Sequence, residues 1–295
     1  MQLPDALVRT LCQTHEDAES WLRDFPDYLK ELESNWDIRA CALVEELSFN
    51  IVMTAEAADG VPYILKLSPP GDDLAREAAA LGTYGGKGAC RLIRTDLAGG
   101  ALLLERLRPG ISLWRTEDDL LAARVCANLL LKLWQPAKDV SPFRTIKSWT
   151  RALPAYVTSK QTFLPADLSD LAHGLLQELL QSEDELILLH ADLHHGNILS
   201  ATREPYLAID PKGILGPKAF DVTAFLRNPI GVSTRPNFEA LLERRLDIFR
   251  EMLGLPKREL AAWGVVHTVL SSCWMGEGSD HQEAILVARK LSRYL

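Results

Sequence analysis

A short polar segment in the second half of the chain holds the side chains best suited to chemistry. Residues 190–197 read His-Ala-Asp-Leu-His-His-Gly-Asn, and residues 209–213 read Ile-Asp-Pro-Lys-Gly. Asp192 is followed by Asn197 and, after an apolar strand, by Asp210. Two carboxylates and one amide on a loop and the hairpin after it indicate phosphoryl transfer.

Phosphoryl transfer to a hydroxyl needs one group that accepts a proton and others that hold Mg²⁺. A carboxylate within hydrogen-bond reach orients the hydroxyl and takes its proton, which is the role expected for Asp192. Mg²⁺ prefers hard oxygen ligands and takes one or two from the protein. We therefore predict Asn197 and Asp210 as metal ligands for ATP-bound Mg²⁺. The predicted catalytic set is Asp192, Asn197 and His190, of which His190 braces the loop and does not react.

The same segment has two other interpretations. Asp, His, Gly and Asn are common turn formers, so any one of them alone would favour an ordinary turn between two strands. His190 and His194 have a spacing that suits zinc on a helix, but the segment is typical of a loop, and no Cys or Glu lies close by. The joint pattern favours the phosphotransferase.

Short apolar runs in the first half of the chain predict a small sheet. Strands are expected at residues 41–44, 49–54 and 63–67, with Asp59-Gly60 as the turn of a hairpin. A helix follows Pro70-Gly71-Asp72, and two more strands lie around residue 92 and at 101–104. This order predicts a compact antiparallel sheet carrying one helix.

The remainder of the chain has mostly helical periodicity. Residues 3–34 are expected to form two helices that Pro26 separates. Helices dominate again beyond residue 107, with an interruption at 187–210 that contains short strand-like runs. The predicted fold class is α+β. Its predicted domains are an N-terminal helical extension (1–38), a nucleotide-binding lobe of sheet and helix (39–106), and a helical lobe with the catalytic loop and acceptor site (107–295).

Composition limits the possible partners. The chain has 295 residues, 47% of them hydrophobic, and a formal net charge of -8. This acidic balance argues against nucleic acid. The five cysteines show no C-x-x-C spacing and are typical of reduced thiols. No N-terminal signal pattern or apolar span of ~20 residues occurs, so we expect a cytoplasmic protein without a membrane partner.

The chain resembles the aminoglycoside/hydroxyurea antibiotic resistance kinases from about residue 36 to 292. The double histidine of the loop, the D-P-K-G at 210–213 and the F-L-R-N-P at 225–229 are more specific than the general kinase motif. Choline, fructosamine and macrolide kinases share the fold but differ in these motifs. The resemblance implies a bilobal protein-kinase-like fold and ATP·Mg²⁺-dependent phosphorylation of a hydroxyl.

The resemblance also implies nucleotide-binding residues in the sheet lobe. Lys66 occupies the strand position of the lysine that neutralises the α- and β-phosphates, and Glu77 is placed to pair with it. Ser48 lies in the first turn, where the family usually has glycines and this chain has Glu46-Leu47-Ser48; its hydroxyl would contact a phosphate. Adenine would bind backbone near Glu105 and Leu107.

For the acceptor, the resemblance implies a cationic aminoglycoside. A polycation needs carboxylates in its pocket, and the acidic stretch after a tryptophan in this family corresponds here to residues 273–280. We expect Trp274, Glu277 and Asp280 to bind the acceptor together with Asp192. The family more often shows W-S-x-E-D-G, so the second acid is shifted in this chain.

The sequence is compared with three other functions by the residues that favour or disfavour each. One is a kinase of another small hydroxylated metabolite. Another is a non-catalytic pseudokinase that only binds nucleotide or ligand, which the glycine-poor first turn favours and the intact Asp192, Asn197, Asp210 and Lys66 disfavour. The third, a protein kinase, fits poorly because no A-P-E follows residues 210–213 and no activation loop has room.

Overall fold

The computed structural model describes residues 3–44, 49–136, 139–159, 161–181 and 186–295. Its internal contacts divide the chain into two compact units, Met1–Arg108 and Pro109–Leu295. The first unit is built on a sheet and the second is mainly helical, as the sequence predicted. Among the described residues, none of the helices combines the length and apolarity needed to cross a bilayer.

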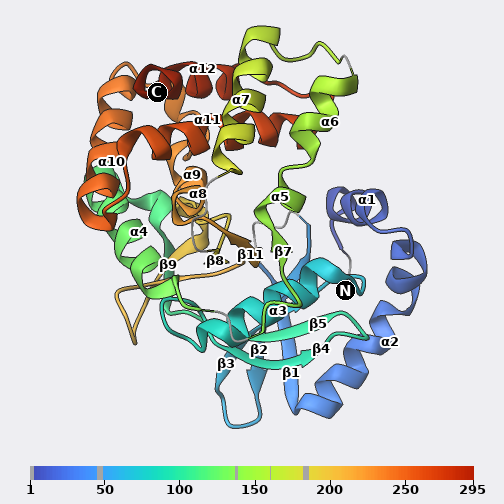
Figure 1. The fold of residues 1–295 in the computed structure, drawn as a ribbon. Helices are drawn as coiled ribbons and strands as arrows, with labels where there is room; N and C mark the ends of the chain where they lie inside the picture. Colours follow the sequence, from blue (N-terminus) through green and yellow to red (C-terminus); the bar gives the residue numbers. More distant parts are fainter. Residues whose placement is uncertain (1–2, 45–48, 137–138, 160, 182–185) are drawn as a thin grey trace. The chain divides into compact units, whose positions relative to one another are not determined.

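Unit one is a five-stranded antiparallel sheet in the order β1-β2-β3-β5-β4 (Figure 1). The helix α3 (Asp72–Tyr84) joins β3 to β4, so the predicted order of three strands, a helix and two strands is confirmed. Lys66 lies on the central strand, paired with Val52 on one side and Leu102 on the other. The strands are β1 (Ile38–Leu43), β2 (Ile51–Ala57), β3 (Pro62–Leu67), β4 (Leu92–Asp96) and β5 (Ala101–Glu105).

The N-terminal helices are α1 (Asp5–Thr14) and α2 (Ala18–Trp36). The expectation that Pro26 separates two helices was wrong, because the break falls before Ala18 and Pro26 lies inside α2. A proline inside a helix lacks an N–H and crowds the preceding turn, at a cost of ~3 kcal/mol. Tertiary packing offsets this cost: Phe25 and Leu32 of α2 are buried in the core of the unit, each worth about 1.5–3 kcal/mol.

Two side-chain hydrogen bonds fix α2 on either side of the proline. The Trp21 indole Nε1 donates to the Gly99 carbonyl at 2.9 Å, and the Tyr28 hydroxyl donates to Asp96 Oδ2 at 2.9 Å. Both acceptors lie in or next to the turn between β4 and β5. Helix α2 is therefore part of the packing of unit one.

Unit two is a set of helices around α11 (Lys257–Met275), which is buried continuously from Leu260 to Ser272. Neighbouring helices cover α11 on several sides (Figure 1), which explains why its sequence shows little amphipathic periodicity. The other helices are α4 (Asp119–Leu133), α5 (Ile146–Trp149), α6 (Ala152–Ser159), α7 (Ala166–Leu179), α8 (Lys218–Asp221), α9 (Thr223–Leu226), α10 (Phe238–Leu253) and α12 (Gln282–Leu291).

Two small sheets in unit two position the polar segment. One has the order β7-β11-β8 and the other β10-β9-β6. The polar loop leaves β8 and enters β9, and the following hairpin leads through β10 to β11. Their bounds are β6 (Pro109–Ser112), β7 (Arg144–Thr145), β8 (Ile187–Leu189), β9 (Ile198–Ala201), β10 (Tyr206–Ala208) and β11 (Ile214–Gly216). The sequence predicted β9 and β10 but not β6, β7 or β11.

A buried ion pair joins α4 to α10. The Arg245 side chain is fully buried, and its guanidinium bonds the Asp119 carboxylate and three backbone carbonyls, those of Phe225, Leu226 and Asn228. All three carbonyls lie at the end of α9, so one cation satisfies a helix terminus and a carboxylate together.

Removing the acid should therefore destabilise unit two. We expect Asp119→Ala to lower the free energy of unfolding by about 3–5 kcal/mol, because the Arg245 charge would stay buried without its partner. Urea unfolding of the full chain measures this loss. Glu178→Gln is the matched control, since the Glu178–Arg258 pair is exposed at the surface and should contribute little. Equal unfolding midpoints for the two variants would contradict the assignment.

Candidate active site

The loop after β8 begins with a backbone conformation that side chains rarely adopt. Ala191 has φ 63° and is buried. Its N–H donates to Asp221 Oδ1 at 2.6 Å, and the His190 N–H donates to Asp221 Oδ2 at 3.2 Å. The left-handed residue turns the chain out of the strand, and one carboxylate binds both amides of that turn.

Asp221 is the buried group that holds this turn. It is fully buried, and its Oδ2 also accepts a hydrogen bond from the Trp134 indole at 3.0 Å. Burial raises the pKa of Asp221 to about 6, although the three N–H donors act in the opposite direction. These contacts show that Asp221 holds the backbone of the loop.

His190 ties the loop to the strand that precedes Asp210. The ring is fully buried, with Nε2 2.9 Å from the Ile209 carbonyl. Nδ1 accepts a hydrogen bond from the Asp192 N–H at 3.3 Å, which requires the neutral ring with its proton on Nε2. Burial lowers the pKa of His190 to about 4. A neutral, enclosed ring braces the loop and has no access to a reacting group.

Asp192 and Asn197 lie at opposite ends of one tight turn. The Asn197 side-chain amide donates to the Asp192 carbonyl at 3.0 Å, so its Oδ1 points elsewhere as an acceptor. The Asn197 N–H bonds the His194 carbonyl, and the Asn197 carbonyl accepts from Ile209. The Asp192 carboxylate itself is partly exposed. The loop thus presents one accessible carboxylate and one amide oxygen.

The Lys212 ammonium contacts both of the predicted carboxylates. Its Nζ lies 2.7 Å from Asp210 Oδ2 and 3.6 Å from Asp192 Oδ2. Asp210 has φ 61° and is a second residue in the left-handed conformation. The Lys212 N–H also bonds the His190 carbonyl at 2.8 Å. Lys212 therefore contacts both carboxylates.

The donor set fits Mg²⁺. Asp210 supplies a partly exposed carboxylate and Asn197 an amide oxygen, both hard ligands of the kind and number that Mg²⁺ takes from a protein. Within the described part of the chain, no cluster of three or more His, Cys, Asp or Glu side chains is arranged to hold a metal.

In unit one, Lys66 and Glu77 form a buried ion pair. Lys66 Nζ lies 2.6 Å from Glu77 Oε2, and both side chains are less than one-tenth exposed. A pair this enclosed needs good geometry to offset its desolvation.

At the end of β5, Glu105 bonds the backbone of Arg91 through its own carboxylate and N–H, and Leu107 is buried. Ser48 lies outside the described residues.

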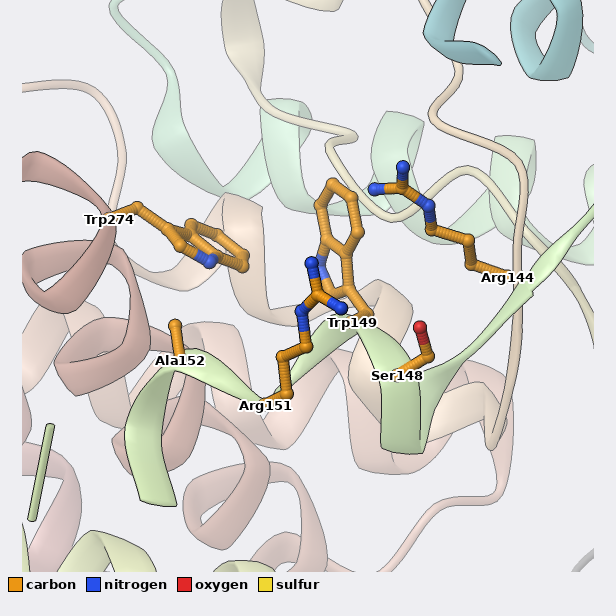
Figure 2. Close-up of a pocket in the computed structure, with 6 residues that line it drawn as sticks. All are labelled: Arg144, Ser148, Trp149, Arg151, Ala152 and Trp274. Atoms are coloured by element: carbon orange, nitrogen blue, oxygen red, sulfur yellow. The ribbon is translucent and has the colours of Figure 1, made fainter. Parts of the chain in front are cut away.

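The residues predicted to bind the acceptor do not all line the same cavity. Trp274 lines a cavity of about 450 Å³ together with Arg144, Ser148, Trp149, Arg151 and Ala152 (Figure 2). Glu277 and Asp280 are exposed and do not line it. Asp280 Oδ1 instead accepts the Gln282 N–H at 2.9 Å at the start of α12. Sequence reasoning missed Trp134 and the residues of α5, because their roles depend on partners distant in the sequence.

The two units and this loop define the chain as a phosphotransferase with a protein-kinase-like fold. A spectinomycin phosphotransferase solved with ADP and spectinomycin aligns over 91% of this chain and 93% of its own, with a TM-score of 0.61 and 14% sequence identity. The α+β fold expected from the sequence is therefore confirmed.

The chain belongs to the aminoglycoside/hydroxyurea antibiotic resistance kinase family, whose model matches residues 36–278. It is a small-molecule kinase. A streptomycin 6-kinase of Streptomyces glaucescens is 29% identical over 93% of this chain and 91% of its own length. A hydroxyurea phosphotransferase of Kitasatospora aureofaciens is 30% identical over 88% of this chain and 76% of its own.

The buried histidines predict loss of stability in mild acid. Burial lowers the pKa values of His190, His194, His195 and His267 below 6.5, so the unfolded chain binds protons there that the folded protein does not. Asp221 acts oppositely, because its raised pKa gives stability that is lost as pH rises through about 6. Four histidines outweigh one acid, so the free energy of unfolding should fall from pH 6.5 toward 4, by up to about 1.4 kcal/mol per pH unit for each net proton.

Urea unfolding between pH 7 and 5 measures this slope. His195→Phe is the informative variant, since the ring stacks on Phe225 at 4.0 Å and its Nδ1 has no hydrogen-bond partner among the described residues. The variant removes one titrating group and keeps the stacking, so its slope should be shallower. Stability that rises below pH 6.5 would show that the histidines do not dominate.

Proposed function

We propose that this protein transfers the γ-phosphoryl group of ATP, bound with Mg²⁺, to a hydroxyl of a small molecule. The observation that carries the proposal is that Lys212 contacts both Asp192 and Asp210, and that Asn197 bonds the Asp192 carbonyl, on a loop that a buried carboxylate holds. This set contains a proton acceptor, two metal ligands and a counter-charge, which are the parts that phosphoryl transfer requires.

Asp192 acts on the acceptor. Its partly exposed carboxylate orients the hydroxyl and takes its proton while the new bond forms between the hydroxyl oxygen and the γ-phosphorus. The bond between that phosphorus and the β,γ-bridging oxygen breaks, and ADP leaves with the electron pair. Asn197 and Asp210 would hold the Mg²⁺, which neutralises charge on the phosphate oxygens.

The nucleotide is bound by residues of unit one. The Lys66 ammonium contacts the α- and β-phosphates, and its 2.6 Å pair with Glu77 fixes its position on the central strand. Adenine bonds backbone near Glu105 and Leu107, and Ser48 contacts a phosphate. His190 acts through Asp192, because it accepts the Asp192 N–H.

Two acceptor classes have support. The relatives named streptomycin 6-kinase favour an aminoglycoside, which Trp274, Glu277, Asp280 and Asp192 would bind. The cavity beside Trp274 favours another hydroxylated metabolite, because two of its six lining residues are arginines and none is acidic. The positive charge of these arginines would repel a polycation.

The role of Asp192 is tested by removing its carboxylate. Asp192→Ala should lower kcat by about 10²–10⁴-fold, because the acceptor proton loses its base, while ATP binding persists. Coupled ADP release with ATP·Mg²⁺ measures turnover over a panel of streptomycin, other aminoglycosides, hydroxyurea, sugars and amino alcohols. Calorimetry measures nucleotide binding.

Equal turnover by the parent and Asp192→Ala would refute the assigned base. If the parent protein releases no ADP with any acceptor of the panel and binds no ATP, the pseudokinase would be favoured. Arg258→Gln, a substitution on the exposed surface of α11, serves as the matched control and should turn over like the parent.

A further inference from the structure

The cavity beside Trp274 is built from two walls of unit two. Arg144, Ser148 and Trp149 come from β7 and α5, Arg151 and Ala152 from the start of α6, and Trp274 from the end of α11. Figure 2 shows the Trp274 and Arg144 side chains reaching in from opposite sides of the Trp149 ring. The volume of about 450 Å³ suits a ligand the size of a small sugar.

The polar groups of this cavity are hydrogen-bond donors with positive charge. Two guanidinium groups, those of Arg144 and Arg151, and the Ser148 hydroxyl lie among the lining side chains. A guanidinium presents a planar fork that matches a carboxylate or phosphate. Trp149 and Trp274 pack edge to face with centroids 5.1 Å apart, which leaves aromatic surface for the apolar face of a ring.

Both walls continue into the elements that hold the catalytic loop. In the sheet β7-β11-β8, Arg144 pairs with Ile214, and Ile214 pairs with Leu189, the residue before His190. Two strand spacings of ~4.8 Å put the backbone of Arg144 roughly 10 Å from the backbone of Leu189, where the loop starts. On the other wall, the Trp274 ring lies 6.0 Å from His267, which bonds the Thr223 hydroxyl at 2.6 Å, two residues beyond Asp221.

We propose that this cavity binds the anionic group of the acceptor, so that the kinase phosphorylates a hydroxylated organic acid or ester of sugar size. This inference rests on the proposed phosphotransferase function and names its substrate class. The carboxylate or phosphate of the acceptor pairs with Arg151, its ring lies against the tryptophans, and one of its hydroxyls reaches Asp192. A polycation would instead place like charges beside two guanidinium groups.

The selectivity between matched acceptors tests this proposal. Glucose, glucosamine and glucuronate share one ring and differ in charge, so kcat/KM for each in the ADP-release assay isolates the charge effect. We expect glucuronate to exceed glucose, and glucosamine to be poorest. Arg151→Gln should reduce the glucuronate-to-glucose ratio at least tenfold, Arg151→Lys should restore part of it, and Arg258→Gln should leave it at the parent value.

A binding measurement separates failure of this inference from failure of the proposed function. Tryptophan fluorescence of the Asp192→Ala protein, titrated with glucuronate, should report binding that Arg151→Gln weakens in the same background. Glucuronate binding by a parent enzyme that phosphorylates neither glucuronate nor any member of the acceptor panel would overturn the phosphotransferase and retain the anion site. Turnover of streptomycin without glucuronate binding or turnover would overturn the anion site and retain the phosphotransferase.

Discussion

The arrangement of the active site depends on one buried carboxylate. Asp221 accepts the N–H groups of His190 and Ala191 and the indole N–H of Trp134. A loop that leaves a buried strand exposes backbone amides that water cannot reach, and an unpaired one costs about 1–3 kcal/mol. Because the Asp221 oxygens satisfy these donors, Ala191 keeps a left-handed conformation and Asp192 emerges on the accessible side of the turn.

Charge on the loop follows from this geometry. The enclosed His190 ring is neutral, and it accepts a hydrogen bond from the Asp192 N–H that helps to fix the position of Asp192. Lys212 contacts both Asp192 and Asp210, so two acids of like charge stay close before any metal is present. Under the proposed function, the same ammonium would lie next to the phosphate oxygens of the bound nucleotide. Catalysis by positioned charge needs such a preorganised set.

Local signals in the sequence predicted much of the fold and loop. The Asp-Gly turn, the apolar runs and the spacing from Asp192 to Asp210 each depend on neighbours along the chain. What the sequence did not predict depends on distant partners. Pro26 stays helical because α2 packs on the sheet, Trp134 reaches Asp221 from another helix, and the arginine-lined cavity needs α5 and α11 together.

The central claim, that the Asp221 carboxylate holds the catalytic loop, is tested most directly by hydrogen–deuterium exchange. Peptides covering residues 187–199 would be compared between the parent and Asp221→Asn, with α10 as the internal reference. We expect at least tenfold faster exchange in the loop, because an amide replaces one acceptor oxygen with a donor, and unchanged exchange in α10. Unchanged loop protection in a folded Asp221→Asn protein would contradict it.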